Sequence, residues 1–175
     1  MSVGLGVDIV EIDRMARILD KTPSFAFKVF TEGERAYCLK KAHPATHFAA
    51  RFAAKEAVCK ALGTGIMVHG MRPHLIEVVS DHRGKPAIKL HGHAADVAHE
   101  LGVLDIPLSL TYTHSVAVAN AVAITEASRV ESERRRDVKA ELAEQFKEVR
   151  GMLDDLGKET ADQQTRIEVE ALTEE

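Results

Sequence analysis

An acidic and a basic side chain lie one helical turn apart in the segment RFAAKEAVCKALGTG, residues 51–65. Residues four apart share one face of a helix, so Glu56 and Lys60 project side by side. Arg51 and Lys55 form a second, basic pair about a quarter-turn away, which would place three cations around one carboxylate. An exposed ion pair of this kind typically contributes less than about 1 kcal/mol, so the helix alone does not distinguish it from a phosphate site.

A second carboxylate lies in the alternating N-terminal segment VGLGVDIVEIDR. In a strand, Asp8 shares its face with Gly4 and Gly6, which permit close approach of a backbone or a ligand. Desolvating this carboxylate is costly unless a cation or a metal pairs with it; pairing with a buried arginine or capping a turn is the alternative. Two carboxylates suit magnesium better than zinc, and together with Lys60 could bind a diphosphate through the metal. The pattern therefore predicts a magnesium and diphosphate site at Asp8, Glu56 and Lys60.

The elements that must position these groups follow from the apolar periodicity and the turn signals. We expect a helix to begin near Glu11 and another at Thr31, where Thr31 and Glu34 form a capping box. The helix that carries the motif begins at Pro44, and its charged residues should lie away from an apolar, core-facing stripe of Phe48, Phe52, Cys59 and Leu62. We expect strands at 3–10, 75–80, 86–90, 107–113 and 116–124, and a further helix at 93–101. This order predicts an α+β fold.

Four segments together resemble the holo-acyl-carrier-protein synthases, the small bacterial 4′-phosphopantetheinyl transferases. They are GVDIVEIDR at 6–14, the motif at 51–65, DHRGKPAIKL at 81–90 and LSLTYTHSVAVANAVAI at 108–124, and the resemblance spans 3–124. It implies an antiparallel sheet packed against the long motif helix. It also implies Mg²⁺-dependent transfer of the phosphopantetheine arm of coenzyme A to a serine of apo acyl carrier protein, releasing adenosine 3′,5′-bisphosphate, in support of fatty acid biosynthesis.

The resemblance also implies roles for individual residues. Asp8 and Glu56 resemble the metal ligands, and Lys60 resembles a lysine that contacts the phosphates; these three are the candidate catalytic residues. The identity of the general base stays open. Arg14 resembles a residue that contacts the carrier.

The coenzyme-binding residues implied by the resemblance are Arg51, Lys60, Gly63, Thr64, Gly65 and His114. Arg51 and His114 resemble residues that hold the 3′-phosphate end, and the loop from Gly63 to Gly65 resembles a turn that contacts the coenzyme. Simple helix termination is the alternative for this loop, because Gly63 is also a good helix C-cap. His114 follows Thr111-Tyr112-Thr113, where the family usually has Ser-x-Ser or Ser-x-Thr, and this departure makes the contact of His114 with the coenzyme the least secure.

Two other function classes remain open on the sequence. One is a catalytically silent module that binds the carrier protein, and the other is a magnesium-dependent diphosphate hydrolase. The intact Asp8, Glu56 and Lys60 favour the transferase over the silent module. Dependence on the carrier protein would separate the transferase from the hydrolase.

Composition restricts the class of protein further. The chain has 175 residues, 45% of them hydrophobic, and no apolar stretch long enough to span a membrane, so we expect a cytoplasmic enzyme. Cys38 and Cys59 lack a metal-binding spacing and are expected to be free thiols. The histidines at 91, 93 and 99 fit no standard zinc site. Nucleic acid is an unfavourable partner, because the formal net charge is −4 and aromatic residues make up only 5%.

The character of the chain changes near Ile124. Residues 126–175 hold 15 acidic and 9 basic side chains, which indicates an appended charged segment after a domain at 1–125. A heptad-like spacing predicts a helix with a frayed end, formed by Leu142, Phe146, Val149, Leu153 and Leu156. This helix could be solvated, pack on its own domain, be partly disordered or associate with a second copy. The family resemblance separately implies a homotrimer with active sites at subunit interfaces.

Overall fold

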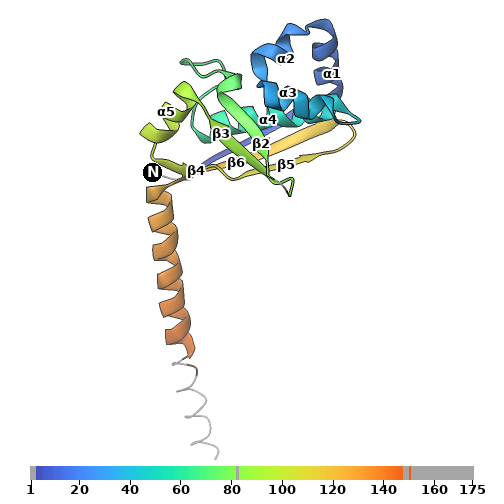
Figure 1. Ribbon diagram of the computed structural model, residues 1–175. Helices are drawn as coiled ribbons and strands as arrows, with labels where there is room; N and C mark the ends of the chain where they lie inside the picture. Colours follow the sequence, from blue (N-terminus) through green and yellow to red (C-terminus); the bar gives the residue numbers. More distant parts are fainter. Residues whose placement is uncertain (1–2, 82, 148–149, 151–175) are drawn as a thin grey trace, which may run out of the picture. The chain divides into compact units, whose positions relative to one another are not determined.

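The computed structural model describes residues 3–81, 83–147 and 150 of the chain (Figure 1). It divides into two compact units, Met1–Arg129 and Val130–Glu175. The helices of the first unit are α1 (Ile12–Lys21), α2 (Ser24–Val29), α3 (Glu32–Leu39), α4 (Pro44–Ala61) and α5 (Gly92–Glu100), with a 3₁₀ turn η1 (Pro73–Leu75). The strands are β1 (Gly4–Glu11), β2 (Ile76–Ser80), β3 (Pro86–Leu90), β4 (Val103–Asp105), β5 (Leu108–Tyr112) and β6 (Val116–Thr125).

The long strand β6 is the centre of the main sheet. It pairs antiparallel with β1 along its length, from Gly4 opposite Ala123 to Glu11 opposite Val116. It also pairs antiparallel with β5 and with the short β4, while β2 and β3 form a separate hairpin. Figure 1 shows helix α4 lying across the sheet formed by β1 and β6.

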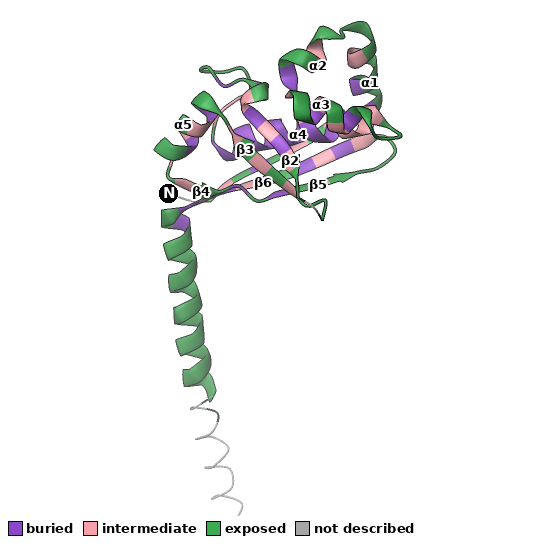
Figure 2. Cartoon of the chain, in the orientation of Figure 1, coloured by how far each residue is buried: buried purple, intermediate pink, exposed green. Residues whose placement is uncertain are grey.

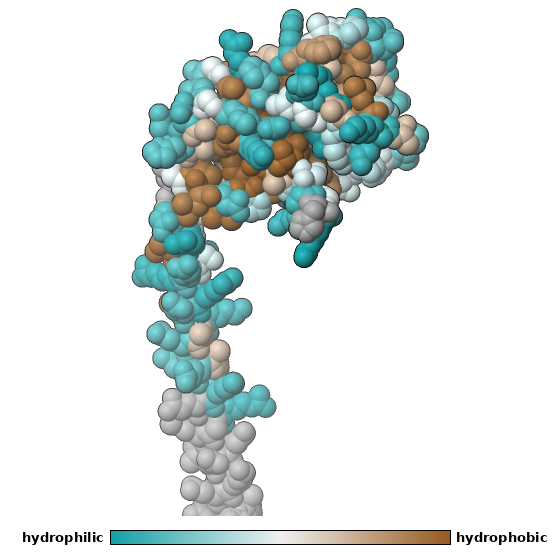
Figure 3. Space-filling view, viewed as in Figure 1, coloured by the Kyte–Doolittle hydropathy of each residue, from teal (hydrophilic) through white to brown (hydrophobic). Residues whose placement is uncertain are grey.

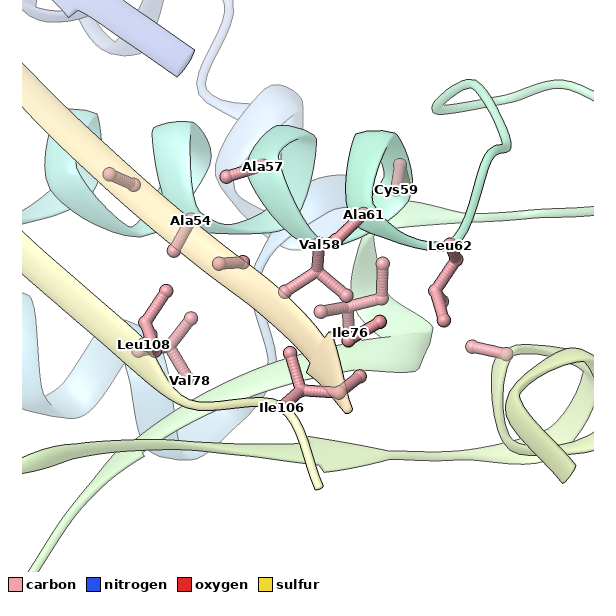
Figure 4. Packing of buried hydrophobic residues seen from close by; sticks show 14 of the residues in the cluster. Ala54, Ala57, Val58, Cys59, Ala61, Leu62, Ile76, Val78, Ile106 and Leu108 are labelled. Atoms are coloured by element: carbon pink, nitrogen blue, oxygen red, sulfur yellow. The ribbon is translucent and has the colours of Figure 1, made fainter. Parts of the chain in front are cut away.

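Small side chains allow α4 to lie close to the sheet. Alanines from α4 meet alanines from β6, and the β2–β3 hairpin and the start of β5 complete the cluster with larger aliphatic residues (Figure 4). Close packing at this interface requires small residues on both sides. The cluster includes Ala54, Ala57, Ala61, Ile76, Val78, Ile106, Leu108, Ala119 and Ala121.

A second buried cluster joins α1, α2 and α3 to the first half of α4. Its centre is an edge-to-face pair of Phe30 and Phe48, whose ring centroids are 4.9 Å apart. Helix α3 begins with the expected capping box: Thr31 Oγ1 accepts from the Glu34 amide, and Glu34 Oε2 accepts from the Thr31 amide. This box satisfies two backbone amides that the first turn of α3 would otherwise leave without a partner.

The face of β1 that is turned away from α4 is apolar and exposed. Val3, Leu5, Val7 and Ile9 are between 45% and 64% exposed, whereas Gly6 on the opposite face is buried. One face of this strand is therefore an apolar surface that the single chain leaves open.

The fold class is confirmed, since an antiparallel sheet packs against the long motif helix. The expected elements are present within a residue or two of their expected bounds. The elements α2 and β4 were not predicted from the sequence; both are short, and a helix as short as α2 gives only a weak periodic signal. Residues 126–147 are helical, as expected, but Val149, Leu153 and Leu156 lie outside the described residues.

No helix within the described part of the chain is both long and apolar enough to cross a membrane.

Candidate functional site

Asp8 and Lys60 form the closest contact of the predicted site. Lys60 Nζ lies 2.8 Å from Asp8 Oδ1 and also donates to the Val7 carbonyl oxygen at 2.9 Å. The Lys60 side chain is 49% exposed and that of Asp8 only 17%, so the ion pair lies at the surface with its carboxylate partly covered. The structure thus joins the strand carboxylate to the helix lysine, which the sequence separates by 52 residues.

Glu56 lies one turn before Lys60 on α4 and shares this environment. Burial raises the pKa of Glu56, and the negative charge of Asp8 raises it further, while Lys60 lowers it. Two neighbouring carboxylates form a negative site that attracts a cation. Asp8 and Glu56 are therefore the described residues that could hold a divalent metal ion, with Lys60 beside them.

Two glycines bring these groups together. A Cβ atom on Gly4 would lie 2.0 Å from the Ala61 carbonyl oxygen, and one on Gly6 would lie 1.9 Å from the Ala57 carbonyl oxygen. Only glycine permits this approach of strand to helix. The close approach predicted from these residues is thus made by the α4 backbone, and it brings Asp8, two residues after Gly6, against Glu56 and Lys60.

A cavity of about 570 Å³ opens beside the carboxylates, between β1, α1, α2 and α4. Asp8, Glu11, Glu56 and Arg14 supply its charged lining, and its apolar lining includes Met15, Ile18, Phe25 and Phe52. The apolar periodicity predicted Phe52 in the core stripe and gave no signal for Phe25. That Phe25 and Phe52 line this cavity could have been inferred only from knowing that their rings, on α2 and α4, lie against each other.

Lys55 does not belong to this site, which corrects the expectation of three cations around Glu56. Its side chain is fully buried and pairs with buried Glu34, with Nζ 2.8 Å from Oε2. Lys55 Nζ also donates to the carbonyl oxygens of Pro73 and Ile76. Burial lowers the pKa of Lys55, and the charge of Glu34 opposes that shift. Lys55 therefore joins α3, α4 and β2 in the core, where the sequence pattern had placed it on a charged face.

Arg51 is also buried, one and a half turns before Glu56 on α4. Its guanidinium lies over the Tyr37 ring at 3.9 Å, and its Nε makes no hydrogen bond to a described residue. Arg51 lies close enough to His47 to lower the pKa of that histidine, although burial is the larger cause. The expectation that Arg51 lies on a face away from the core was wrong.

His114 lies at the tip of the turn between β5 and β6, where Thr113 Oγ1 accepts from the Ser115 and Val116 amides. It lines a second cavity of about 800 Å³, together with His43, His47, Asp13 and Tyr112. The cavity that contains Asp8 and Glu56 is lined by other residues. Within one chain, the structure therefore places Arg51 and His114 in a different region from the carboxylate site.

The loop from Gly63 to Gly65 ends α4. Gly63 has a φ of +70°, and the Thr64 amide donates to the Cys59 carbonyl oxygen at 2.8 Å. This is the left-handed helix cap that the helix-termination alternative predicted. No atom lies within 4 Å of where a Cβ on Gly63 would be, so the loop is open on that side.

The remaining metal candidates do not form a site. His91 Nε2 contacts Glu77 Oε2 and His93 Nε2 contacts the His69 carbonyl oxygen, each at 2.9 Å. Among the described residues, no group of three or more histidine, cysteine or acidic side chains is arranged to hold a metal. Cys38 and Cys59 are free and buried, as expected, and burial raises the pKa of each thiol to about 11.

Comparisons with known proteins agree with the geometry. Residues 4–121 match the family model described as the 4′-phosphopantetheinyl transferase superfamily. The holo-acyl-carrier-protein synthase of Alkaliphilus metalliredigens is 47% identical over 124 residues, which cover 70% of this chain and 99% of that protein.

Two solved structures show the same fold. The holo-acyl-carrier-protein synthase of Neisseria meningitidis is 33% identical, with a TM-score of 0.64 over 70% of this chain and 98% of that one. The Bacillus anthracis synthase, solved in complex with coenzyme A (3′,5′-ADP), is 34% identical with a TM-score of 0.58 over 70% and 96% of the two chains. From Gly4 to Ala121, this chain belongs to the 4′-phosphopantetheinyl transferase superfamily, as a member of its holo-acyl-carrier-protein synthase group.

Proposed function

We propose that this chain transfers 4′-phosphopantetheine from coenzyme A to a serine of apo acyl carrier protein at the site formed by Asp8, Glu56 and Lys60. The observation that carries the proposal is the convergence of these three side chains, with Asp8 and Glu56 lining one cavity and Lys60 paired with Asp8, in a chain of this family. The serine hydroxyl gives up its proton to a base as its oxygen forms a bond to the β-phosphorus of the coenzyme, and the bond from that phosphorus to the bridging oxygen breaks. Adenosine 3′,5′-bisphosphate leaves with the bridging oxygen.

In this proposal the basic residue of the site contacts the diphosphate, and the two acidic residues hold the metal ion. Lys60 is the exposed cation, and its ammonium group can turn from Asp8 to the diphosphate oxygens. Asp8 and Glu56 form a two-carboxylate donor set, which fits Mg²⁺ because this ion commonly takes one or two carboxylates and completes its shell with water and substrate phosphates. When bound there, Mg²⁺ neutralises charge on the diphosphate.

The 3′-phosphate end of the coenzyme belongs, in this proposal, to the region of Arg51 and His114. No carboxylate pairs with Arg51 among the described residues, and His43 and His47 line the cavity next to it. Because this cavity is separate from the carboxylate cavity in one chain, we place the coenzyme between two copies, with its diphosphate on one and its 3′-phosphate on the other. The open loop from Gly63 to Gly65 would contact the coenzyme beside Lys60.

The assembly we propose is a homotrimer. Its support in this chain is the exposed apolar row on β1, because a contiguous apolar surface of this kind commonly marks a protein interface. We further place the reaction in the cytoplasm, in support of fatty acid biosynthesis; the two free thiols suit a reducing compartment.

The carrier protein is proposed to dock at Arg14, which lines the carboxylate cavity. Arg14→Glu should raise the KM for the carrier severalfold with little change in the KM for coenzyme A, because it places a negative charge where an acidic partner approaches. Arg17→Glu is the matched control, since Arg17 lies on the same helix and does not line the cavity. An unchanged carrier KM in Arg14→Glu would remove this residue from the docking site.

Mass spectrometry of an intact apo acyl carrier protein tests the function directly. After incubation with this chain, coenzyme A and Mg²⁺, we expect a mass gain of one phosphopantetheine group on a serine, and no gain without the metal. Binding of several carriers with no mass gain would instead support the silent module. Coenzyme cleavage that proceeds at the same rate without a carrier would support the hydrolase.

A further inference from the structure

A separate cavity of about 860 Å³ opens on the first unit between α2, the start of α3 and the segment 67–74. It shares no lining residue with the cavity of the carboxylates or with that of His114. Its volume is in the range of about 300–1,000 Å³ that is common for small-molecule sites. None of the residues to which we give a part in the transfer lines this cavity, so the proposed reaction does not account for it.

The titratable side chains that line this cavity are all basic, namely Lys28, Arg35, Arg72 and His74. The side chains of Lys28, Arg72 and His74 form no hydrogen bond or ion pair with any residue that the structure describes. Basic groups gathered around a concave surface, with no carboxylate in the lining, create a positive potential that concentrates anions. The lining therefore favours a ligand that carries a negative group.

Contacts within the protein hold the side of the cavity formed by α2 and α3. Arg35 on α3 donates to the Phe30 carbonyl oxygen at 2.6 Å, and its guanidinium lies over the Phe27 ring at 4.6 Å. Thr31 donates to Glu77, a carboxylate outside the lining that is itself paired with a histidine. Arg35 thus has a fixed position and no carboxylate partner among the described residues, which lowers the cost of ordering it around a ligand.

Apolar side chains make up much of the remaining lining. Phe30, Met71 and Pro73 are buried, whereas Phe27 and Met67 are 68% and 69% exposed. In Figure 2 both α2 and the loop that follows α4 include exposed, green stretches, and Figure 3 shows apolar surface among hydrophilic side chains on this face of the first unit. Methionine side chains are flexible and adapt to apolar groups of different shapes. An apolar chain lying against Phe27 and Met67 would remove their exposed surface from water.

The other side of the cavity is held in an uncommon backbone conformation. Met67 and His69 have φ angles of +62° and +48°, a region that residues other than glycine adopt rarely. His93 Nε2 lies 2.9 Å from the His69 carbonyl oxygen, and a Cβ on Gly70 would lie 3.3 Å from the His93 ring. Such conformations persist only where surrounding contacts hold them, and they are common at ligand clamps. The wall that presents Met67 is therefore in place before any ligand binds.

We propose that this cavity binds a small amphiphilic anion, of the class of medium-chain fatty carboxylates. The carboxylate lies among Lys28, Arg35 and Arg72, because hydrogen bonds between charged groups are the strong ones. The unbranched chain lies against Phe27 and Met67. A ligand of this class uses both the unpaired cations and the exposed apolar side chains, whereas an inorganic anion would use only the cations. The inference does not rest on the proposed transfer, since neither the diphosphate site nor the assembly contributes to this cavity.

Isothermal titration calorimetry of the full-length chain with octanoate tests this site. Two further probes separate the parts of the ligand: acetate carries the charge without the chain, and 1-octanol carries the chain without the charge. We expect octanoate to bind, and each of the other two to bind at least about tenfold more weakly, because each loses one of the two kinds of contact. No binding of octanoate, or equal affinity for octanol, would overturn the proposal.

Variants locate the bound octanoate. Arg72→Gln should weaken its binding about tenfold, since this change removes a charge-assisted contact and leaves no described partner of Arg72 unpaired. Met67→Asn should also weaken it, because asparagine tolerates the left-handed backbone but lacks the apolar side chain. Arg14→Gln is the matched control, because Arg14 lines the carboxylate cavity, which has an apolar wall of its own. Affinity that is lost in Arg14→Gln and kept in Arg72→Gln would place octanoate in the carboxylate cavity and overturn the proposal.

Discussion

At the scale of single residues, the fold and the proposed metal site favour opposite charge states of the Glu56 carboxylate. Burial and the neighbouring Asp8 raise its pKa, so the folded chain without metal binds a proton at Glu56 more readily than the unfolded chain does. The metal-free protein therefore loses stability as pH rises through this pKa. The same charge that destabilises the fold is the one that would hold a cation.

Glu56→Gln should separate these two effects. At neutral pH we expect a higher Tm for the metal-free variant, because the neutral amide removes the unfavourable charge, and no gain at a pH low enough to protonate glutamate. Transfer should fall by about 100-fold, a size typical of losing one electrostatic contact to a transition state. Thermal unfolding and carrier mass gain are the measurements.

The control is Glu100→Gln at the exposed end of α5, which should change neither quantity. As the pH is lowered, the activity of the unaltered chain should begin to fall at a higher pH than it would with an ordinary glutamate, because protonated Glu56 cannot bind a cation. Undiminished Mg²⁺-dependent turnover in Glu56→Gln would show that this residue is not a metal ligand.

At the scale of secondary structure, the site depends on how closely β1 approaches α4. Lys60 reaches both Asp8 and the Val7 carbonyl oxygen only because Gly4 and Gly6 leave no side chain between strand and helix. On its other side, α4 is held by the buried Lys55–Glu34 pair, whose partners include the Val78 amide and the Pro73 carbonyl oxygen. The elements thus place the carboxylates before any ligand binds.

Gly6→Ala tests the close approach. Its Cβ would meet the Ala57 backbone oxygen at 1.9 Å, so the strand must move, and we expect both a lower Tm and weaker transfer. Gly33→Ala is the matched control, because the nearest atoms to its added methyl group lie 3.5 Å away or farther and alanine favours a helix. If Gly6→Ala kept the activity and the Tm of the unaltered chain, the packing argument would be wrong.

The buried ion pair can be tested by a double-mutant cycle. Lys55→Met should lower the free energy of unfolding by about 3–5 kcal/mol, since it leaves the Glu34 carboxylate buried beside an apolar side chain. Adding Glu34→Gln should cost less than the sum of the two single changes, because the remaining charge is removed. Denaturant unfolding measures all three variants; purely additive losses would contradict direct coupling of the pair.

At the scale of the whole molecule, the exposed apolar row on β1 is the surface that we propose as the interface with another copy. Val3, Leu5, Val7 and Ile9 alternate with the residues that face α4, so one strand serves both the site and the outer surface. An assembly formed there would place the proposed metal ligands, Asp8 and Glu56, close to a neighbouring copy. This arrangement would explain why one chain separates Arg51 and His114 from the carboxylates.

Leu5→Arg tests the assembly. The side chain is 64% exposed in one chain, so a charge there should leave the fold intact but disrupt an interface, and sedimentation should show a shift from trimer to monomer. Leu39→Arg on α3, 67% exposed, is the control and should keep the parent mass. A parent of monomeric mass, or a trimer that survives Leu5→Arg, would rule out this face as the interface.

Local patterns were sufficient to predict many features. The alternation of 3–10, the capping box at Thr31 and Glu34, and the start of the motif helix at Pro44 each depend on neighbouring residues only, and each is present. The pairing of Glu56 with Lys60 on one helix face is equally local. For the same reason the cap at Gly63 was visible in the sequence as one of two alternatives.

The sequence by itself thus determined the order of the longer elements, the family resemblance, and the residues Asp8, Glu56 and Lys60 as candidates. Only the tertiary structure decided which cations serve the site. Lys55 and Arg51 have the same spacing signal as Lys60, but their burial depends on Glu34 and Tyr37, which reach α4 from a different helix. Helical periodicity gives the face of a residue, whereas the partner that makes a buried charge tolerable comes from packing between elements distant in sequence.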